Sequence, residues 1–206
     1  MWYVEKYLIP SMLKQGIQEK DIKVYNDDKG EGNLRACLNA FASCEGDGAT
    51  WHLQDDVCIC KDFKERTELY CEGLVAGFSS EVYDGPGKVG PVTIENMWFS
   101  FPCILIPNEY ARHSSEWISK SIIGNPVYKH LWEKGKNDDA LFRMYLKNFH
   151  KNEPALNIAP NLVDHVDYLL GGGSGGIRKR EVRAQYWKDY DVVKELEDAL
   201  DYNKKR

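Results

Sequence analysis

The residues Ala49-Thr50-Trp51-His52-Leu53-Gln54-Asp55-Asp56 combine an apolar, β-prone run with two adjacent carboxylates at its end. The run predicts a buried strand, because aromatic and β-branched residues are favoured in strands. Adjacent carboxylates repel each other, and a divalent cation removes that cost. The same pair is also common in a helix cap or a solvated turn. The end of this strand is therefore the first candidate for a metal site, with a plain turn as the alternative.

Strand, loop and helix alternate around this stretch. Residues 22–26 alternate apolar and polar side chains, as a strand does, and apolar residues recur at helical intervals from Asn33. Residues 73–78 indicate another buried strand. This order predicts an α/β fold with a mostly parallel central sheet flanked by helices. Since ligands bind beyond the carboxyl ends of such strands, Asp28 and Asp55 are expected to face one site.

The second half of the chain continues the alternation. Residues 97–106 are strongly apolar and β-prone, and Asn137 can cap a helix with the apolar stripe Leu141, Phe142, Tyr145, Leu146 and Phe149. The glycine-rich residues 171–176 predict a mobile loop or hinge, because glycine loses the most backbone entropy on ordering. We expect one domain over residues 1–188 and an amphipathic helix in the tail, 189–206.

Composition limits the classes of function. With 206 residues, of which 43% are hydrophobic, the chain can bury one core. A net charge of −5 argues against a nucleic-acid-binding surface built on a large positive field. No apolar run approaches the roughly 18 residues of a membrane span, and the N-terminus lacks the pattern of a secretory signal. We therefore expect a cytoplasmic protein without a membrane span.

The six cysteines lie in apolar segments, at Cys37, Cys44, Cys58, Cys60, Cys71 and Cys103. This placement favours reduced, mostly buried thiols over a disulfide framework. No pair of cysteine pairs has zinc-finger spacing, so a structural zinc site is not expected.

Residues 51–57, followed by Asp62-Phe63, resemble the strand-borne Asp-x-Asp region of GT-A glycosyltransferases. The resemblance extends over most of residues 20–187 and implies the Rossmann-like GT-A fold. The compact size and the lack of an export signal or membrane anchor favour a small stand-alone member of microbial or phage type. By this resemblance Asp56 is the principal metal ligand. Gln54 stands where the family has its first carboxylate, and Asp55 is the partner on the nucleotide or sugar side.

Residues 160–166 resemble a late strand of such transferases, in which a histidine completes the metal shell. The match implies that His165 binds the same Mn²⁺ or Mg²⁺ ion as Asp56. The alternative is a histidine that is hydrogen-bonded within the core.

Nucleotide contacts are expected from two further segments. Residues 27–33 resemble the first nucleotide-contacting loop of the fold, which makes Asp28 and Asn33 candidates. Arg178 and Arg180 follow the glycine run, and a closing loop would bring such cations to the diphosphate. A solvated basic run that only flanks the tail is the alternative for these arginines.

Asp138 and Asp139 resemble the acidic start of a helix that faces the acceptor in these enzymes. If the reaction inverts the anomeric centre, one of them takes the proton of the acceptor. If configuration is retained, no such base is needed. Carboxylates in a first helical turn are also favoured by the helix dipole alone.

The expected function is a metal-dependent transfer of a sugar from a nucleoside-diphosphate sugar, with UDP as the expected nucleotide. The acceptor is open among a glycan, a protein and a modified base, and the charged tail leaves a homo-oligomer open. One alternative is a metal-dependent nucleotidyltransferase or phosphohydrolase. Another is a catalytically inactive GT-A-fold binding protein, favoured because only Trp2-Tyr3-Val4 can form a strand before the first helix.

Overall fold

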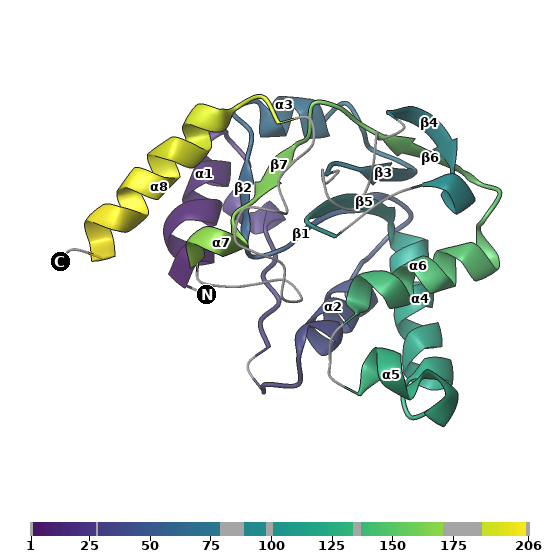
Figure 1. Ribbon diagram of the computed structural model, residues 1–206. Coiled ribbons are helices and arrows are strands. Elements are labelled where there is room, and N and C mark those ends of the chain that lie inside the picture. The colour runs from purple at the N-terminus through teal and green to yellow at the C-terminus, as the bar shows by residue number, and fades with distance from the viewer. Residues whose placement is uncertain are drawn as a thin grey trace.

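The computed structural model describes residues 2–27, 29–78, 89–97, 101–133, 137–170 and 187–204, which form two sheets and the helices around them (Figure 1). The larger sheet has five strands in the order β1-β5-β3-β6-β4, and the smaller one pairs β2 with β7. The strand bounds are β1 (Ala49–Leu53), β2 (Val57–Ile59), β3 (Leu74–Ala76), β4 (Gly90–Thr93), β5 (Cys103–Pro107), β6 (Pro154–Asn157) and β7 (Val163–His165).

The prediction of a mostly parallel, Rossmann-like GT-A sheet is wrong. In the larger sheet β1 and β3 both pair antiparallel with β5, and β4 pairs antiparallel with β6. Only β3 and β6 run parallel. A parallel pair needs a crossover of a dozen or more residues, usually a helix. Residues 22–26, the expected preceding strand, form no strand, and β2, which follows β1 after residues 54–56, belongs to the other sheet.

The helices include most of those that the sequence predicts. Their bounds are η1 (Val4–Leu8), α1 (Ile9–Lys14), η2 (Glu19–Asp21), α2 (Asn33–Ala42), α3 (Phe63–Thr67), η3 (Ile94–Asn96), α4 (Asn108–Trp117), η4 (Ile118–Ile122), η5 (Pro126–Tyr128), α5 (Lys129–Trp132), α6 (Asp138–Phe149), α7 (Asp167–Leu170) and α8 (Tyr190–Lys204). Helix α2 begins at Asn33 as expected. Asn137 precedes α6 with a left-handed φ of 66°, but its side chain makes no capping hydrogen bond to the helix.

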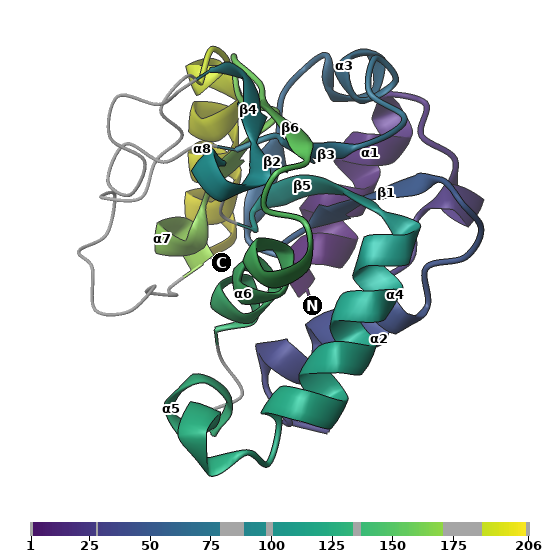
Figure 2. The same ribbon diagram turned by 90° about the vertical axis from the view of Figure 1, so that its right-hand side faces the viewer.

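The larger sheet is covered on both faces. Strand β5 shows why, because its alternate side chains enter different cores. Ile104 and Ile106 pack with Phe41 and Phe142 beneath α2, α4 and α6. Leu105 packs on the other face, with β2, β7, α1 and α8. Figures 1 and 2 show these two groups of helices on opposite sides of the sheet. Full burial of each such side chain contributes about 1.5–3 kcal/mol.

The tail helix α8 packs on the same core as the smaller sheet. Its buried residues are Val193, Leu196 and Leu200. The backbone N–H of Lys61 donates to Asp189 at 3.0 Å, just before the helix. Residues 190–204, within the tail where the sequence predicts an amphipathic helix, thus form α8, which lies against the rest of the chain.

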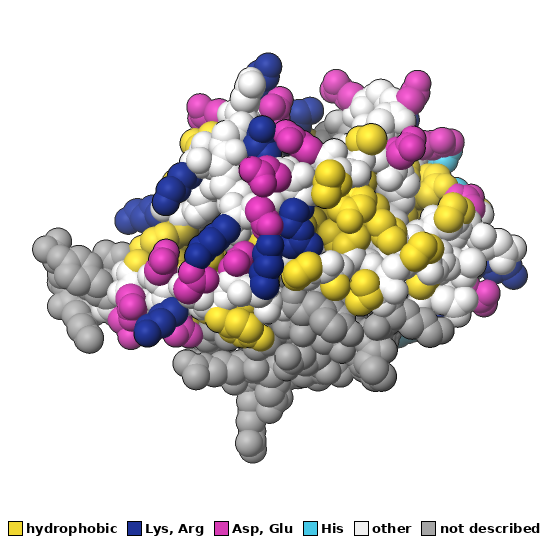
Figure 3. Space-filling view, turned by 90° about the horizontal axis from the view of Figure 1, so that it is seen from above, with side chains coloured by type: hydrophobic (Ala, Val, Ile, Leu, Met, Phe, Trp, Pro, Cys, Tyr) yellow, Lys and Arg dark blue, Asp and Glu magenta, His cyan; other side chains and the backbone are white. Residues whose placement is uncertain are grey.

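The surface carries charges of both signs. On the described part of the face shown in Figure 3, lysine and arginine side chains lie beside aspartate and glutamate side chains. Such mixing creates no extended field of one sign on this face. None of the helices in the described ranges is long and apolar enough to cross a membrane.

Candidate metal centre

The antiparallel pairing of β2 with β7 brings together two residues that lie more than a hundred positions apart in the sequence. Val57 stands opposite His165 in the register. One residue before β2, the carbonyl oxygen of Asp56 accepts a hydrogen bond from the backbone N–H of Val166 at 2.8 Å. The turn after β1 therefore places Asp56 directly beside the end of β7.

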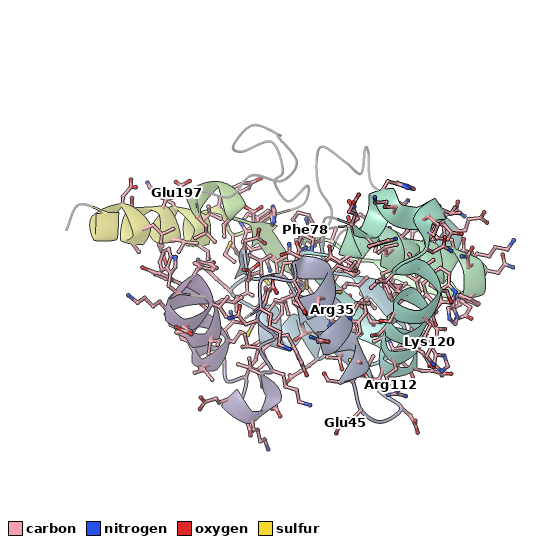
Figure 4. The ribbon with its side chains drawn as sticks, turned by 90° about the horizontal axis from the view of Figure 1, so that it is seen from below. Arg35, Glu45, Phe78, Arg112, Lys120 and Glu197 are labelled. Carbon is pink, nitrogen blue, oxygen red and sulfur yellow. The ribbon has the colours of Figure 1, made fainter. Side chains whose placement is uncertain are left out.

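The side chains of Asp56 and His165 meet at this point. His165 Nε2 lies 3.1 Å from Asp56 Oδ2, and the two side chains are 5% and 28% exposed. The imidazole ring lies 6.3 Å from the ring of Phe78, which is fully buried. Figure 4 shows Phe78 in the middle of the molecule, between the helices of the two sides. The histidine of the pair therefore lies beside a buried apolar ring, and the aspartate is partly exposed to solvent.

The geometry of the pair fits a bound cation. Neighbouring ligands of an octahedral ion with bonds of about 2.1 Å lie roughly 3 Å apart, which is close to the observed separation. Among the described residues, Asp56 Oδ1 is buried and has no hydrogen-bond partner. A buried acceptor left unsatisfied costs about 1–3 kcal/mol, and a cation would remove that cost. One carboxylate oxygen and one imidazole nitrogen suit Mn²⁺ better than Mg²⁺, which prefers oxygen ligands.

The same two atoms also fit a direct hydrogen bond between imidazole and carboxylate. In that case the pair only joins the turn to β7. The two interpretations differ in what a cation does to the folded protein, because only a metal centre gains stability from Mn²⁺.

Asp55 lies in the same turn and belongs to the same electrostatic group. Burial raises its pKa, and the neighbouring carboxylate of Asp56 raises it further. A positive charge bound at Asp56 would offset this repulsion. Asp55 thus lies next to Asp56 and within electrostatic reach of His165.

Tyr3 contacts the first residue of β2, next to this turn, and the sequence did not predict this contact. Its buried hydroxyl donates to the carbonyl oxygen of Val57 at 2.8 Å. Burial, followed by Cys58 and Asp56, raises the pKa of Tyr3 well above its usual value, so the phenol stays neutral. Tyr3 lies in a helical turn, which corrects the idea of a short strand at residues 2–4. No local pattern in the sequence could join it to a residue 54 positions away.

The expected nucleotide loop lies apart from this pair. Asp28 is outside the described residues, and Asn33 is an exposed residue at the start of α2. The carboxylate of Asp27 accepts the backbone N–H groups of Glu31 at 2.6 Å and Gly32 at 2.7 Å, so it holds the loop closed. Beside this loop is a cavity of about 210 Å³, lined by Asn26, Asp27, Lys29, Glu31, Arg35, Ala36 and Asn39.

The expected catalytic aspartates begin α6. Burial raises the pKa of Asp138 to about 6, and Asp139 contributes to the same shift. Asp139 Oδ1 accepts the backbone N–H of Ala140 at 2.7 Å. Within the described residues, no hydrogen bond or ion pair joins either aspartate to the Asp56–His165 pair. Arg178 and Arg180, the expected diphosphate contacts, lie outside the described residues.

A second group of ligand-type side chains was not predicted. Atoms of Cys60, Asp62 and Asp189 lie within 4.8 Å of one another. Lys188 Nζ is 2.5 Å from Asp62 Oδ2, so an ammonium group already lies beside this carboxylate. Burial also raises the pKa of Cys60 to about 12, which keeps the thiol protonated. This group is therefore a poorer cation site than the Asp56–His165 pair. A cavity of about 430 Å³ next to it, between α1, α3 and α8, does not reach that pair.

Comparison with known proteins adds no relative. No family model matches the chain, and neither the curated proteins nor the solved structures give a match. The functional argument therefore rests on the geometry of Asp56 and His165.

Proposed function

We propose that the chain is a metal-dependent glycosyltransferase that binds Mn²⁺ on Asp56 and His165 and takes its sugar from a nucleoside-diphosphate sugar, with UDP as the nucleotide. The observation that carries the proposal is the 3.1 Å contact between His165 Nε2 and Asp56 Oδ2, beside the unpartnered Asp56 Oδ1. The proposal keeps the chemistry implied by the two short motifs and does not depend on a parallel sheet.

The ion would supply Lewis-acid stabilisation of the negative charge that develops on the leaving diphosphate. The protein's own part is to hold the two ligands in place. The β2–β7 register fixes both backbones, Phe78 flanks the imidazole, and Tyr3 anchors the turn. Asp55 is the adjacent acceptor for a hydroxyl group of the donor.

Asp138 is the candidate base for an inverting reaction. A carboxylate with a pKa of about 6 is largely ionised at neutral pH and is more basic than an ordinary aspartate. It can therefore accept the proton of an acceptor hydroxyl group. A retaining reaction would leave Asp138 without this role.

A non-catalytic nucleotide-binding protein is the second candidate. It is favoured by the lack of any contact, in the described residues, between Asp138 and the metal centre. A nucleotidyltransferase or phosphohydrolase has less support, because such enzymes often bring together carboxylates for two ions. Besides Asp56, the described carboxylates next to His165 are Asp55 in the same turn and Asp164, and Asp164 Oδ1 already accepts the backbone N–H of His165 at 3.0 Å.

The test is calorimetric titration of UDP, GDP and UDP-sugars with and without Mn²⁺. We expect binding that needs Mn²⁺ and is lost in both Asp56→Ala and His165→Ala. Asp47→Ala, which removes an exposed carboxylate near the start of β1, is the matched control and should bind normally.

The products then identify the reaction class. A transferase incubated with donor alone should slowly release free sugar and nucleoside diphosphate, whereas release of nucleoside monophosphate would indicate phosphohydrolase chemistry. Metal-dependent binding without any turnover would support the binding protein. Binding that is tight without metal, or absent for every nucleotide, would contradict the proposal.

A further inference from the structure

Strand β1 forms an open edge of the larger sheet. It has β5 on one side, and no strand of the described residues lies on the other. Its five residues contain no lysine and no proline, and its register with β5 is continuous, without a bulge. Natural edge strands commonly carry a lysine, a proline or a bulge, each of which prevents pairing with another chain. Strand β1 has none of these three features.

The hydrogen bonds next to β1 show which backbone groups face outward. Gln54 N donates to the carbonyl oxygen of Pro102 at 3.2 Å, and Asn108 N donates to that of Gly48 at 2.8 Å. Residues of an antiparallel strand alternate between facing the partner and facing away from it. The N–H and C=O groups of Ala49, Trp51 and Leu53 therefore point away from β5. In the described part of the chain these six groups have no hydrogen-bond partner.

The side chains of the same three residues are apolar and share one face. Ala49, Trp51 and Leu53 are partly buried against the core that contains β2 and β7. Thr50 is exposed, and the ring of His52 meets Phe41 on the opposite face. The edge thus offers apolar residues on one face and polar residues on the other.

This pattern is self-complementary. A second β1 running antiparallel about a two-fold axis at Trp51 would pair Ala49 with Leu53 and Trp51 with Trp51. All outward N–H and C=O groups would then find partners, and apolar residues would meet apolar residues. Thr50 would stand opposite His52 on the polar face. A two-fold axis of this kind gives the same contact on both subunits.

We propose that the outer edge of β1 pairs with β1 of a second copy of this chain, which joins the two five-stranded sheets into one. The acidic residues Asp47 and Asp55 flank the strand and would approach each other across the axis. Their repulsion should weaken as salt is added, so association should strengthen with ionic strength. This proposal does not rest on cation binding, although Asp55 belongs to the turn that carries Asp56.

The test combines sedimentation velocity with hydrogen exchange from micromolar to several hundred micromolar protein. We expect a monomer–dimer equilibrium that shifts toward the dimer at high salt. The amides of Trp51 and Leu53 should become protected as the dimer forms. A chain that stays monomeric over the whole range would overturn the proposal and leave the edge for a strand of another protein.

Two variants locate the interface. Ala49→Lys places a charge on the apolar side of the edge and should raise the dimer dissociation constant by at least about tenfold. Thr93→Lys adds the same charge at an exposed position on β4, the opposite edge, and should leave it unchanged. A dimer that forms without protection of Trp51 and Leu53, or that a folded Ala49→Lys protein retains, also overturns the assignment. If Ala49→Lys does not fold, hydrogen exchange of Trp51 and Leu53 in the wild type still tests whether β1 forms the interface.

Discussion

His52 is a partly buried imidazole in the middle of β1. Its ring meets Phe41 edge-on at 4.9 Å, and Nε2 lies 3.8 Å from Cys44 Sγ. Burial lowers the pKa of His52 to about 4. Burial also raises the pKa of Cys44, so thiol and imidazole are both neutral at neutral pH. The two do not form the ion pair that a cysteine nucleophile needs.

The lowered pKa of His52 predicts how the stability of the folded protein changes in acid. The unfolded chain takes up the proton near pH 6.5 and the folded chain only near pH 4, so this histidine costs stability as pH falls through that window. The free energy of unfolding should be lower at pH 4 than at pH 7. In His52→Gln this difference should be smaller by about 2 kcal/mol. Urea denaturation at both values measures it, with His130→Gln, an exposed histidine, as control. An unchanged difference would contradict the prediction.

The raised pKa of Asp138 has the opposite effect on how stability depends on pH. Its folded pKa of about 6 lies above the usual value of 3.8, so the folded state holds the proton more tightly. Stability is therefore lost as pH rises through this range, and the ionised carboxylate is a cost at neutral pH. Asp138→Asn should stabilise the protein at pH 7.5 by about 1–2 kcal/mol and have little effect at pH 3.5.

The same variant separates a functional from a merely structural carboxylate. If Asp138 is the base, Asp138→Asn should lose transfer activity while it gains stability, a trade-off that is common at active sites. Full activity in the stabilised variant would remove Asp138 from the mechanism. Asp139→Asn is the natural companion, because Asp139 Oδ1 is already bonded to the backbone.

Among single residues, the resemblance of two short motifs to a transferase family implied that Asp56 and His165 bind one ion. The structure places the two side chains 3.1 Å apart, and the ion stays a prediction. The motifs were not sufficient to predict Tyr3 or Phe78, whose contacts with the pair depend on long-range packing. The acidic start of α6 was predicted correctly as a helix start. Its expected role as the base that takes the proton of the acceptor stays a prediction.

At the scale of elements, the junction of β3 with its neighbours is closely packed around Gly77. Its N–H donates to the carbonyl oxygen of Cys103 at 2.9 Å, and its own carbonyl accepts from Leu162 N at 2.7 Å. A Cβ atom here would lie 2.8 Å from Cys103 Sγ and 3.2 Å from Trp51 Cζ3. β1, β5 and residue 162 can therefore approach one another closely only because Gly77 has no side chain.

Gly77→Ala should destabilise the protein by about 1–3 kcal/mol, because the added methyl group overpacks a filled core. Thermal or urea denaturation measures the loss. Gly48→Ala is the matched control, since a Cβ atom at that glycine meets nothing within 4 Å. Equal stability of the two variants would contradict the packing described for Gly77.

Sequence patterns predicted the existence of elements better than their direction. Apolar runs and helical spacing located β1, β3, α2, α6 and α8. Periodicity reports which face of an element is buried, but it does not report which way the chain runs. β1 and β2 belong to different sheets, so the short link between them does not set the direction of a strand pair. The larger sheet pairs strands that lie far apart in the sequence, such as β1 with β5, and neither periodicity nor the length of the links predicts that they run antiparallel.

For the whole molecule, the packing of α8 bears on how the chain divides. The expected boundary at residue 188 separates the tail from the body, yet Leu200 is only 3% exposed within the core that holds β2 and β7. Leu200→Ala should lower the free energy of global unfolding by about 2–4 kcal/mol in a single transition. Leu69→Ala, at a residue that is 73% exposed, should change little. A separate early transition of the tail would instead show an independent appendage.

The central claim is that Asp56 and His165 bind a divalent cation. The most direct measurement is electron paramagnetic resonance of free Mn²⁺ during titration into the wild-type protein and into Asp56→Asn, which keeps the size of the side chain and removes its charge. The claim predicts one bound ion per chain in the wild type and its loss in the variant. Equal binding by both proteins, or none by the wild type, would contradict it and leave the 3.1 Å contact as a hydrogen bond between imidazole and carboxylate.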